Sequence, residues 1–330
     1  MRSIRAYTTD RRGIQLATVI LTMLNAGGIA ADSPAPITLR IDAPFLNTAR
    51  FENGFFTTQV PYTDGAAQEN LAVFRQDGSL QFKTRVWFPD AVRVGLYDAA
   101  TDAAGRALVG GSATKGDGTA ALFLAVLDNT GKLITAIQTN PYTPTHVCFG
   151  PDGSLWAMVR NVSVDGMPAG SRKDYNVVQR YSQSGALLGS WVPLSSFNLS
   201  SFQRAAHPAQ AGGMRWAAFL RSSGSRIAAY FATTGDLYEF SADGSAVTHT
   251  ASPSRTGISI RGFAYTSSGA VYTVQTVDRK NGLYVLDKPS GAWSEVTTGP
   301  QVHLLFGSTG AALVCRPSGD MANVIFRPVE

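Results

Sequence analysis

The feature that most constrains the fold of this chain is a short turn motif that recurs through most of its length. The clearest copy is Phe149–Trp156, FGPDGSLW, in which an apolar strand end leads through a turn to a new apolar strand. Related copies lie at Phe74–Leu80, Leu127–Leu133, Tyr181–Leu187, Phe240–Ser245, Tyr265–Val271, Leu286–Gly291 and Phe306–Ala311. Each turn contains glycine, which enters the left-handed turn conformation without steric cost. The motif therefore predicts many short antiparallel strands joined by tight hairpins.

The turns group in pairs, which predicts a repeated four-stranded unit of an inner hairpin, a longer connection and an outer hairpin. Units of about fifty residues are typical of β-propeller blades. They are expected over 47–88, 93–137, 146–192, 215–250 and 261–296, with a last unit from His303. The sequence thus predicts an all-β, six-bladed β-propeller. Seven blades are the alternative, because the first unit is poorly patterned.

The last unit is one strand short, because its expected strands over 302–306, 311–315 and 322–327 are followed by the end of the chain. The unassigned stretch Ile37–Ile41 would supply the fourth strand. A terminal strand used in this way closes the ring and removes exposed sheet edges. Residues 37–330 are therefore expected to form a single propeller domain.

The first thirty residues have the pattern of an export signal. Four arginines lie within residues 1–12, the apolar stretch Gly13–Leu24 follows, and small residues stand at 28 and 30. Because the apolar stretch is short for a membrane anchor, we expect cleavage after Ala30 or Ala31. The mature protein is then secreted or periplasmic and has no membrane span. An uncleaved N-terminal anchor is the alternative.

The basic charge of the chain resides largely in this signal. Residues 1–30 contain four Arg and one Asp, so their removal lowers the formal net charge from +5 to +2. A nucleic-acid or anionic-membrane partner would require a clustered basic surface. We therefore expect neither partner, and we expect a monomer.

The two cysteines of the chain, Cys148 and Cys315, fall in units on opposite sides of the expected ring. A disulfide requires the two Cα atoms to lie within about 7 Å of each other. We therefore predict two buried free thiols.

A propeller of this plan has two unlike faces. The turns within the hairpins fall on one face, and the connections between hairpins and between units fall on the other, which we call the long-loop face. The long connections are expected over 62–70, 110–120, 163–175, 193–213 and 277–282. Because binding residues concentrate on loops held by a rigid scaffold, this face is the predicted binding face.

Basic residues stand where five of the inner strands start at this face. They are Arg93, His146, Arg215, Arg261 and His303. Cations that converge there would attract an anionic group, and histidine would make the attraction depend on pH. The alternative is that each cation is paired, with Glu52 or Asp98 as candidate partners, and only closes the top of the core.

Phe149–Trp156 together with Val178–Leu187 resembles the inner and outer hairpins of six-bladed propellers of the NHL-repeat and SMP-30/gluconolactonase-like superfamily. The resemblance covers most of residues 60–315 and implies the fold rather than an activity. Lactonase-like relatives bind a divalent cation such as Ca²⁺ in the channel through acidic and amide side chains. The oxygen ligands that this implies here are Glu52, Asp98 and Asn161.

The sequence contains none of the local catalytic or metal-binding motifs that are read from spacing, such as Gly-x-Ser-x-Gly or His-Glu-x-x-His. We therefore expect an exported binding or scaffolding protein that recognises a peptide, a glycan or a small anion at the long-loop face around the central channel. The alternative is a metal-dependent, lactonase-like hydrolase or lyase with its site in the channel mouth. The sequence leaves open whether the protein is an enzyme.

Overall fold

The computed structural model describes residues 37–40, 49–65, 68–161, 163, 173–197, 218–252, 259–298, 304–306, 313–317 and 323–328. It describes the backbone alone at 37–40, 49, 259, 261, 304–306, 313–317 and 323–328. These residues all belong to one unit, Pro36–Glu330. The expected export signal, residues 1–30, lies outside the described residues.

Strands flank the copies of the turn motif, and the described strands assemble into five sheets. Two connections expected to be long, over 110–120 and 277–282, are instead tight turns at 116–119 and 278–279, because the flanking strands extend into them. The first sheet has the order β2 (Ala49–Glu52), β3 (Phe55–Gln59), β5 (Leu71–Arg75), β6 (Leu80–Thr84). The second sheet has the order β4 (Tyr62–Asp64), β7 (Ala91–Thr101), β8 (Ala107–Lys115), β9 (Ala120–Leu127), β10 (Leu133–Gln138). The strand β4 belongs to a connection of the first unit and was not predicted.

The remaining sheets follow the same plan. The third has the order β11 (Thr143–Phe149), β12 (Leu155–Arg160), β13 (Asn176–Tyr181), β14 (Leu187–Pro193). The fourth has the order β15 (Ala218–Ser223), β16 (Arg226–Phe231), β17 (Asp236–Ser241), β18 (Val247–Ala251). The fifth has the order β1 (Ile37–Arg40), β25 (Asn323–Pro328), β24 (Leu313–Pro317), β23 (Leu304–Phe306), β19 (Ser259–Tyr265), β20 (Val271–Val277), β21 (Lys280–Asp287), β22 (Ala292–Thr298).

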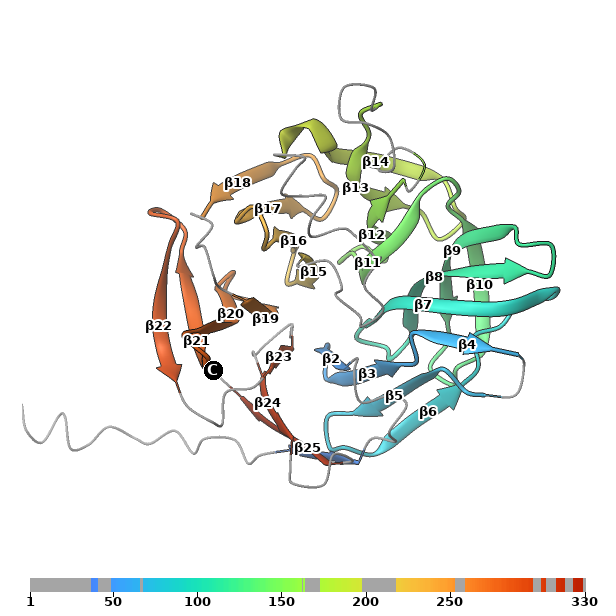
Figure 1. Cartoon of the computed structure of the whole chain (residues 1–330), viewed down its shortest axis with the longest axis horizontal. Coiled ribbons are helices and arrows are strands. Elements are labelled where there is room, and N and C mark those ends of the chain that lie inside the picture. The colour runs from blue at the N-terminus through green and yellow to red at the C-terminus, as the bar shows by residue number, and fades with distance from the viewer. Residues whose placement is uncertain are drawn as a thin grey trace, which may run out of the picture. The chain divides into compact units, whose positions relative to one another are not determined.

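The sheets are arranged around a common axis. Their inner strands neighbour one another in the order β7, β11, β15, β19, β23 and β2, and β2 returns to β7. Figure 1 shows the sheets radiating from this centre. This is the β-propeller arrangement, and the predicted all-β propeller fold is confirmed.

The predicted number of blades is wrong. The described part of the chain has five sheets rather than six or seven. The units expected as the fifth and sixth blades share one eight-stranded sheet, because Gly262 on β19 pairs in parallel with Leu305 on β23. Antiparallel pairing is kept on both sides of this single parallel contact.

An N-terminal strand completes the last unit, as expected. The strand β1 pairs antiparallel with β25, with Ile37 opposite Phe326 and Arg40 opposite Asn323. The two strands come from opposite ends of the described chain. Their pairing covers the edge that β25 would otherwise present to solvent.

The recurring Asp-Gly-Ser turn has a clear physical basis in the copy at Phe149–Trp156. Gly153 has a φ of +79°, which favours glycine. The Asp152 carboxylate accepts the backbone N–H of Ser154 at 3.0 Å. Equivalent bonds join Asp77 to Ser79, Asp117 to Thr119 and Asp243 to Ser245. The aspartate recurs because its side chain replaces a backbone acceptor in the turn.

The hydrophobic core lies between neighbouring sheets. Between the third and fourth sheets, the Trp156 ring stacks on Trp191 at 5.0 Å and lies 5.5 Å from Phe240. Between the fourth and fifth sheets, Tyr230 stacks on Phe263 at 5.3 Å. Large aromatic side chains thus fill the space between the twisted sheets.

The connection after β14 begins with a short 3-10 helix, η3 (Leu194–Ser196). Phe197, which follows it, is buried and lies 4.6 Å from the Phe231 ring. The start of this long connection therefore packs onto the scaffold. Within the described ranges, no helix has the length and apolar character needed to cross a membrane.

Cys148 on β11 is buried and its thiol is free, as predicted. Burial raises the pKa of this thiol well above its ordinary value, so it is protonated at neutral pH. The side chain of Cys315 lies outside the described residues, and its state stays a prediction.

Two turn glycines allow the cost of a positive φ in a residue with a side chain to be separated from the cost of a steric clash of its Cβ. Gly235 and Gly118 have φ values of +80° and +84°, so alanine strains the backbone equally at both. A Cβ at Gly235 would overlap the Ser252 carbonyl oxygen, whereas nothing lies within 4 Å of a Cβ at Gly118. We expect Gly118→Ala to lower the free energy of unfolding by about 1 kcal/mol and Gly235→Ala by about 3 kcal/mol. Urea denaturation of both variants measures the difference, and equal losses would contradict this packing argument.

Candidate functional site

A buried cluster of charged side chains lies where the inner strands meet. Arg50 and Glu52 are alternate residues of β2, so strand geometry places both on one face. Arg50 Nη2 lies 2.7 Å from Glu52 Oε2, and Arg50 Nη1 lies 3.0 Å from Asp98 Oδ2 on β7. The same Nη1 donates to the carbonyl of Val147 on β11 at 2.6 Å. One guanidinium therefore connects three inner strands.

Arg221 adds a fourth inner strand, β15, to this cluster. The neighbouring Ser222 donates its backbone N–H and its hydroxyl to Glu52 Oε1, both at 3.4 Å. Burial and the positive charge of Arg50 lower the pKa of Arg221 to about 10, against the attraction of Asp98 and Glu52. Arg221 therefore remains a cation at neutral pH.

The two carboxylates of the cluster respond differently to burial. Burial raises the pKa of Asp98, but the attraction of Arg50, His146 and Arg221 and a backbone N–H outweigh it, so the pKa lies below its ordinary value. At Glu52 burial outweighs the attraction of the two arginines, and the pKa is raised. Both carboxylates lie in ion-pair contact with Arg50, and the surroundings favour ionisation of Asp98 more than that of Glu52.

β-Bulges stand at matching places on three inner strands. The register shifts between Leu96 and Asp98, between Pro144 and His146, and between Ile260 and Gly262. The extra residues are Tyr97, Thr145 and Arg261, each at the same distance from the hairpin turn that follows it. A bulge changes which residues share a face, and Leu96 and Ala99 accordingly lie in the same core cluster.

The structure separates the two described side chains of the predicted cationic ring. Arg93 is 55% exposed, and its Nε lies 2.5 Å from Asp64 Oδ1. His146 is buried in the cluster, with Nδ1 3.8 Å from Asp98 Oδ2. Both therefore lie beside a carboxylate, as the alternative interpretation expects. Arg215 and His303 lie outside the described residues, as does the side chain of Arg261, so convergence of the five cations stays a prediction.

The divalent cation that the resemblance implies does not fit these side chains. Glu52 and Asp98 are both engaged by Arg50, and Arg221 brings a second positive charge that would repel a cation. Asn161, the third expected ligand, follows β12 and is buried. In the described part of the chain, no group of three or more His, Cys, Asp or Glu is arranged to hold a metal ion.

The ion pairs make stability depend on pH through Asp98. We expect Asp98→Asn to lower the free energy of unfolding by about 3 kcal/mol at pH 7, because it removes a carboxylate that pairs with the buried Arg50. The folded-state pKa of Asp98 is depressed, so its contribution is complete above the unfolded value of about 4 and is lost as pH falls through the folded pKa. The stability difference between wild type and variant should therefore shrink below about pH 4.

Urea denaturation from pH 7 to pH 3 measures this difference. Asp64→Asn is the matched control, because Asp64 also pairs with an arginine but is 69% exposed, and it should change stability little at any pH. A difference for Asp98→Asn that stays constant down to pH 3 would contradict the assigned role.

An exposed aromatic platform lies at the β4 edge of the second sheet. Tyr62 on β4 pairs with Gly95 on β7, and its side chain is 60% exposed. A Cβ at Gly95 would lie 3.1 Å from Tyr62 Cε1, so the ring rests directly against the glycine backbone. Its edge meets the Tyr97 ring at 6.3 Å, and the Tyr97 hydroxyl lies 2.7 Å from the Ser112 hydroxyl. Tyr62 is thereby held in place while much of its surface faces solvent.

An exposed ion pair flanks this platform. Arg93 donates from Nε to Asp64 Oδ1 at 2.5 Å and from Nη2 to Asp64 Oδ2 at 3.3 Å. The paired guanidinium lowers the pKa of Asp64 through its hydrogen bond, so the carboxylate stays ionised. Donors and acceptors therefore stand beside the aromatic ring. The positive charge of Arg93 is largely balanced by its partner.

Sequence reasoning named Glu52, Asp98, His146 and Arg93 but missed Arg50, Arg221 and Tyr62. Arg50 and Arg221 lie close to the hairpin turns that follow β2 and β15, whereas the prediction concentrated on the long-loop ends of the inner strands. The alternation of Arg50 with Glu52 is a usable signal, because polar residues on one face of a buried strand indicate a polar contact. Tyr62 gave no such signal, because its contact with Gly95 depends on an unpredicted strand pairing.

Comparison with known proteins extends the fold assignment but not the functional one. No protein-family model and no curated protein sequence matches the chain. A solved structure of a DUF4221 family member from Bacteroides vulgatus matches with a TM-score of 0.53 and 11% identity, covering 90% of this chain and 96% of the other. A protein from Bacteroides fragilis that is proposed to be exported matches with a TM-score of 0.52 and 10% identity, covering 89% and 93%.

These two matches span nearly the whole of each chain. The fold is shared. At such low identity, no activity or ligand follows from the likeness. Membership of the NHL-repeat and SMP-30/gluconolactonase-like superfamily stays a prediction.

Proposed function

We propose that this chain is an exported, ligand-binding β-propeller that binds a saccharide at the long-loop face, on the platform formed by β4 and β7. Export rests on the sequence of the first thirty residues. The observation that carries the binding proposal is the Tyr62 ring, which is 60% exposed although it is fixed against Gly95.

The chemistry of the platform suits a sugar. A pyranose ring has an apolar C–H face that can lie on an aromatic ring, and hydroxyls around its edge that both donate and accept hydrogen bonds. Tyr62 supplies the aromatic face, while Asp64 accepts and Arg93 donates at its side. A fixed ring loses little conformational freedom on binding, which favours affinity.

The other ligand classes predicted from the sequence find less support. Asp64 balances the charge of Arg93, which weakens attraction for a small anion. The lactonase-like alternative needs free carboxylates in the channel, and Arg50 engages Glu52 and Asp98. A peptide that lays an apolar side chain on Tyr62 remains an outcome for the experiment to distinguish.

A glycan array followed by calorimetric titration of the best-bound saccharide tests this proposal on the purified protein. We expect Tyr62→Ala to weaken the affinity about tenfold or more, because it removes the stacking surface. Gly95→Ala should also weaken it, since the added methyl group displaces the Tyr62 ring.

Leu80→Ala is the control, because Leu80 is an apolar side chain on an outer strand, β6, and is 50% exposed. It should leave the affinity unchanged. Absence of saccharide binding, or equal affinity of wild type and Tyr62→Ala, would overturn the proposal. Binding of an extended peptide in place of any saccharide would replace the ligand class.

A further inference from the structure

A cavity of about 180 Å³ lies at the long-loop end of the second sheet. Its walls come from the start of β7, the end of β8, the start of β9 and the end of β10, together with the segment that leads into β7. The β7–β8 and β9–β10 turns lie at the opposite ends of the same strands, whereas the tight β8–β9 turn, with Asp117 and Thr119, lies at the cavity end. The cavity and the Tyr62 platform therefore share a face of the propeller but use different side chains.

Small residues create the space. Ala113 on β8 stands directly opposite Ala121 on β9 in the strand register, and both line the cavity. Ala91 and Ala136 line it from β7 and β10. A larger residue at any of these positions would occupy the volume that the four methyl groups leave open.

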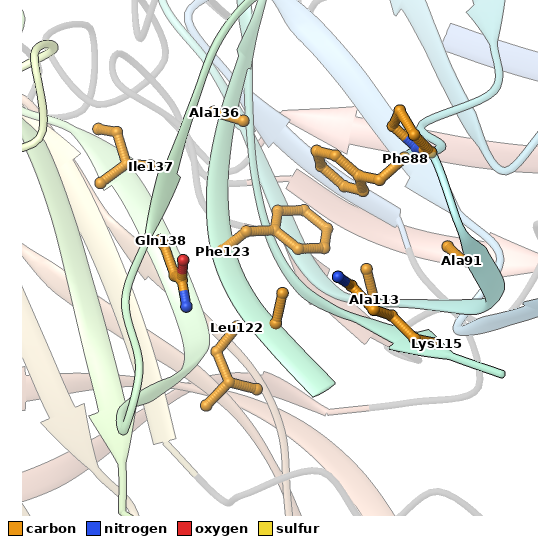
Figure 2. Close-up of a pocket in the computed structure, with 11 residues that line it drawn as sticks. Phe88, Ala91, Ala113, Lys115, Leu122, Phe123, Ala136, Ile137 and Gln138 are labelled. Atoms are coloured by element: carbon orange, nitrogen blue, oxygen red, sulfur yellow. The ribbon is translucent and has the colours of Figure 1, made fainter. Parts of the chain in front are cut away.

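Two phenylalanine rings form the aromatic part of the wall. Phe88 precedes β7, Phe123 lies on β9, and their ring centroids are 4.6 Å apart with an interplanar angle of 58°. Figure 2 shows the two rings close together, with Gln138 to one side of them and Lys115 to the other. The cavity is thus aromatic and aliphatic inside, with an ammonium and an amide group at its margin.

Lys115 is attracted by the charge of the neighbouring Asp117, but both side chains are exposed, so the Lys115 ammonium group is accessible to a ligand. Gln138 donates to the Asn140 side chain at 3.1 Å. The nearby Asp117 carboxylate accepts from the backbone N–H and the hydroxyl of Thr119, at 2.8 and 2.6 Å. Lys115 itself is exposed at the end of β8.

We propose that this cavity binds a single aromatic ring that carries a carboxylate. The ring lies between Phe88, Phe123 and the alanine methyl groups, and the carboxylate pairs with Lys115. The size supports one ring, because an apolar cavity of about 150 Å³ is enough to hold benzene. The site is separate from the saccharide platform and does not depend on it.

Titration of the purified protein with phenylacetate, followed by ligand-observed NMR and calorimetry, tests this inference. We expect a dissociation constant on the order of 1 mM or tighter, in keeping with a ligand of this size. Ala121→Leu fills the cavity and should weaken binding at least tenfold. Ala186→Leu, which adds the same group at an exposed turn position on the third sheet, should have no effect.

The charge contribution is tested with a surface variant that preserves the fold. Lys115→Gln should weaken phenylacetate binding several-fold but leave binding of benzyl alcohol, which has no charge, unchanged. Circular dichroism shows whether each variant folds. Tyr62→Ala should bind phenylacetate as the wild type does, which distinguishes failure of this inference from failure of the saccharide proposal.

No detectable phenylacetate binding by the wild-type protein would overturn the inference. So would equal affinities of wild type and a folded Ala121→Leu variant. Equal loss of phenylacetate and benzyl alcohol binding in Lys115→Gln would overturn the assigned carboxylate contact.

Discussion

The Arg50 guanidinium is the interaction on which the centre of this propeller depends. The sheets of a propeller meet chiefly through side chains, because backbone hydrogen bonds run within each sheet. Arg50 reaches from β2 to Asp98 on β7 and to the Val147 carbonyl on β11, while Glu52 reaches Ser222 on β15. Polar contacts thus join four inner strands that are far apart in the chain. Since these groups are buried, each depends on the others for its counter-charge or hydrogen bond.

The local features of the fold were readable from the sequence, and the pairings between distant segments were not. Gly153 and Asp152 predict a turn, because the positive φ of Gly153 and the hydrogen bond from Ser154 N–H to Asp152 are both local to the turn. The need for a terminal strand could also be inferred, because the last unit was visibly incomplete. The joining of the fifth and sixth units into one sheet could not be inferred from the sequence, because it depends on one parallel contact between Gly262 and Leu305. The strand β4 has only three residues, Tyr62–Asp64, too few for an alternating pattern to stand out.

The residues of the candidate site were only partly predictable from the sequence. Binding at the long-loop face stays a prediction, and Tyr62 and the cavity near Phe123 are the features that the structure offers there. The choice of Arg93 assumed that a basic residue at a strand start stays unpaired, whereas Asp64 on the unpredicted strand neutralises it. The bulge at Tyr97 also changes which face of the sheet the later β7 side chains occupy. A prediction from strict alternation therefore assigns those residues to the wrong face.

The pairing of β1 with β25 brings segments near the two ends of the propeller unit into the geometry of a hairpin. Ile37 stands opposite Phe326 in an antiparallel register, so a short peptide linker could join them without disturbing either strand. New termini could then be opened at an exposed turn such as the one at Ser267 and Ser268. The order of the strands along the chain would change while every hydrogen-bonded neighbour stayed the same. A circularly permuted chain should therefore form the same sheets, because the fold does not depend on where its termini lie.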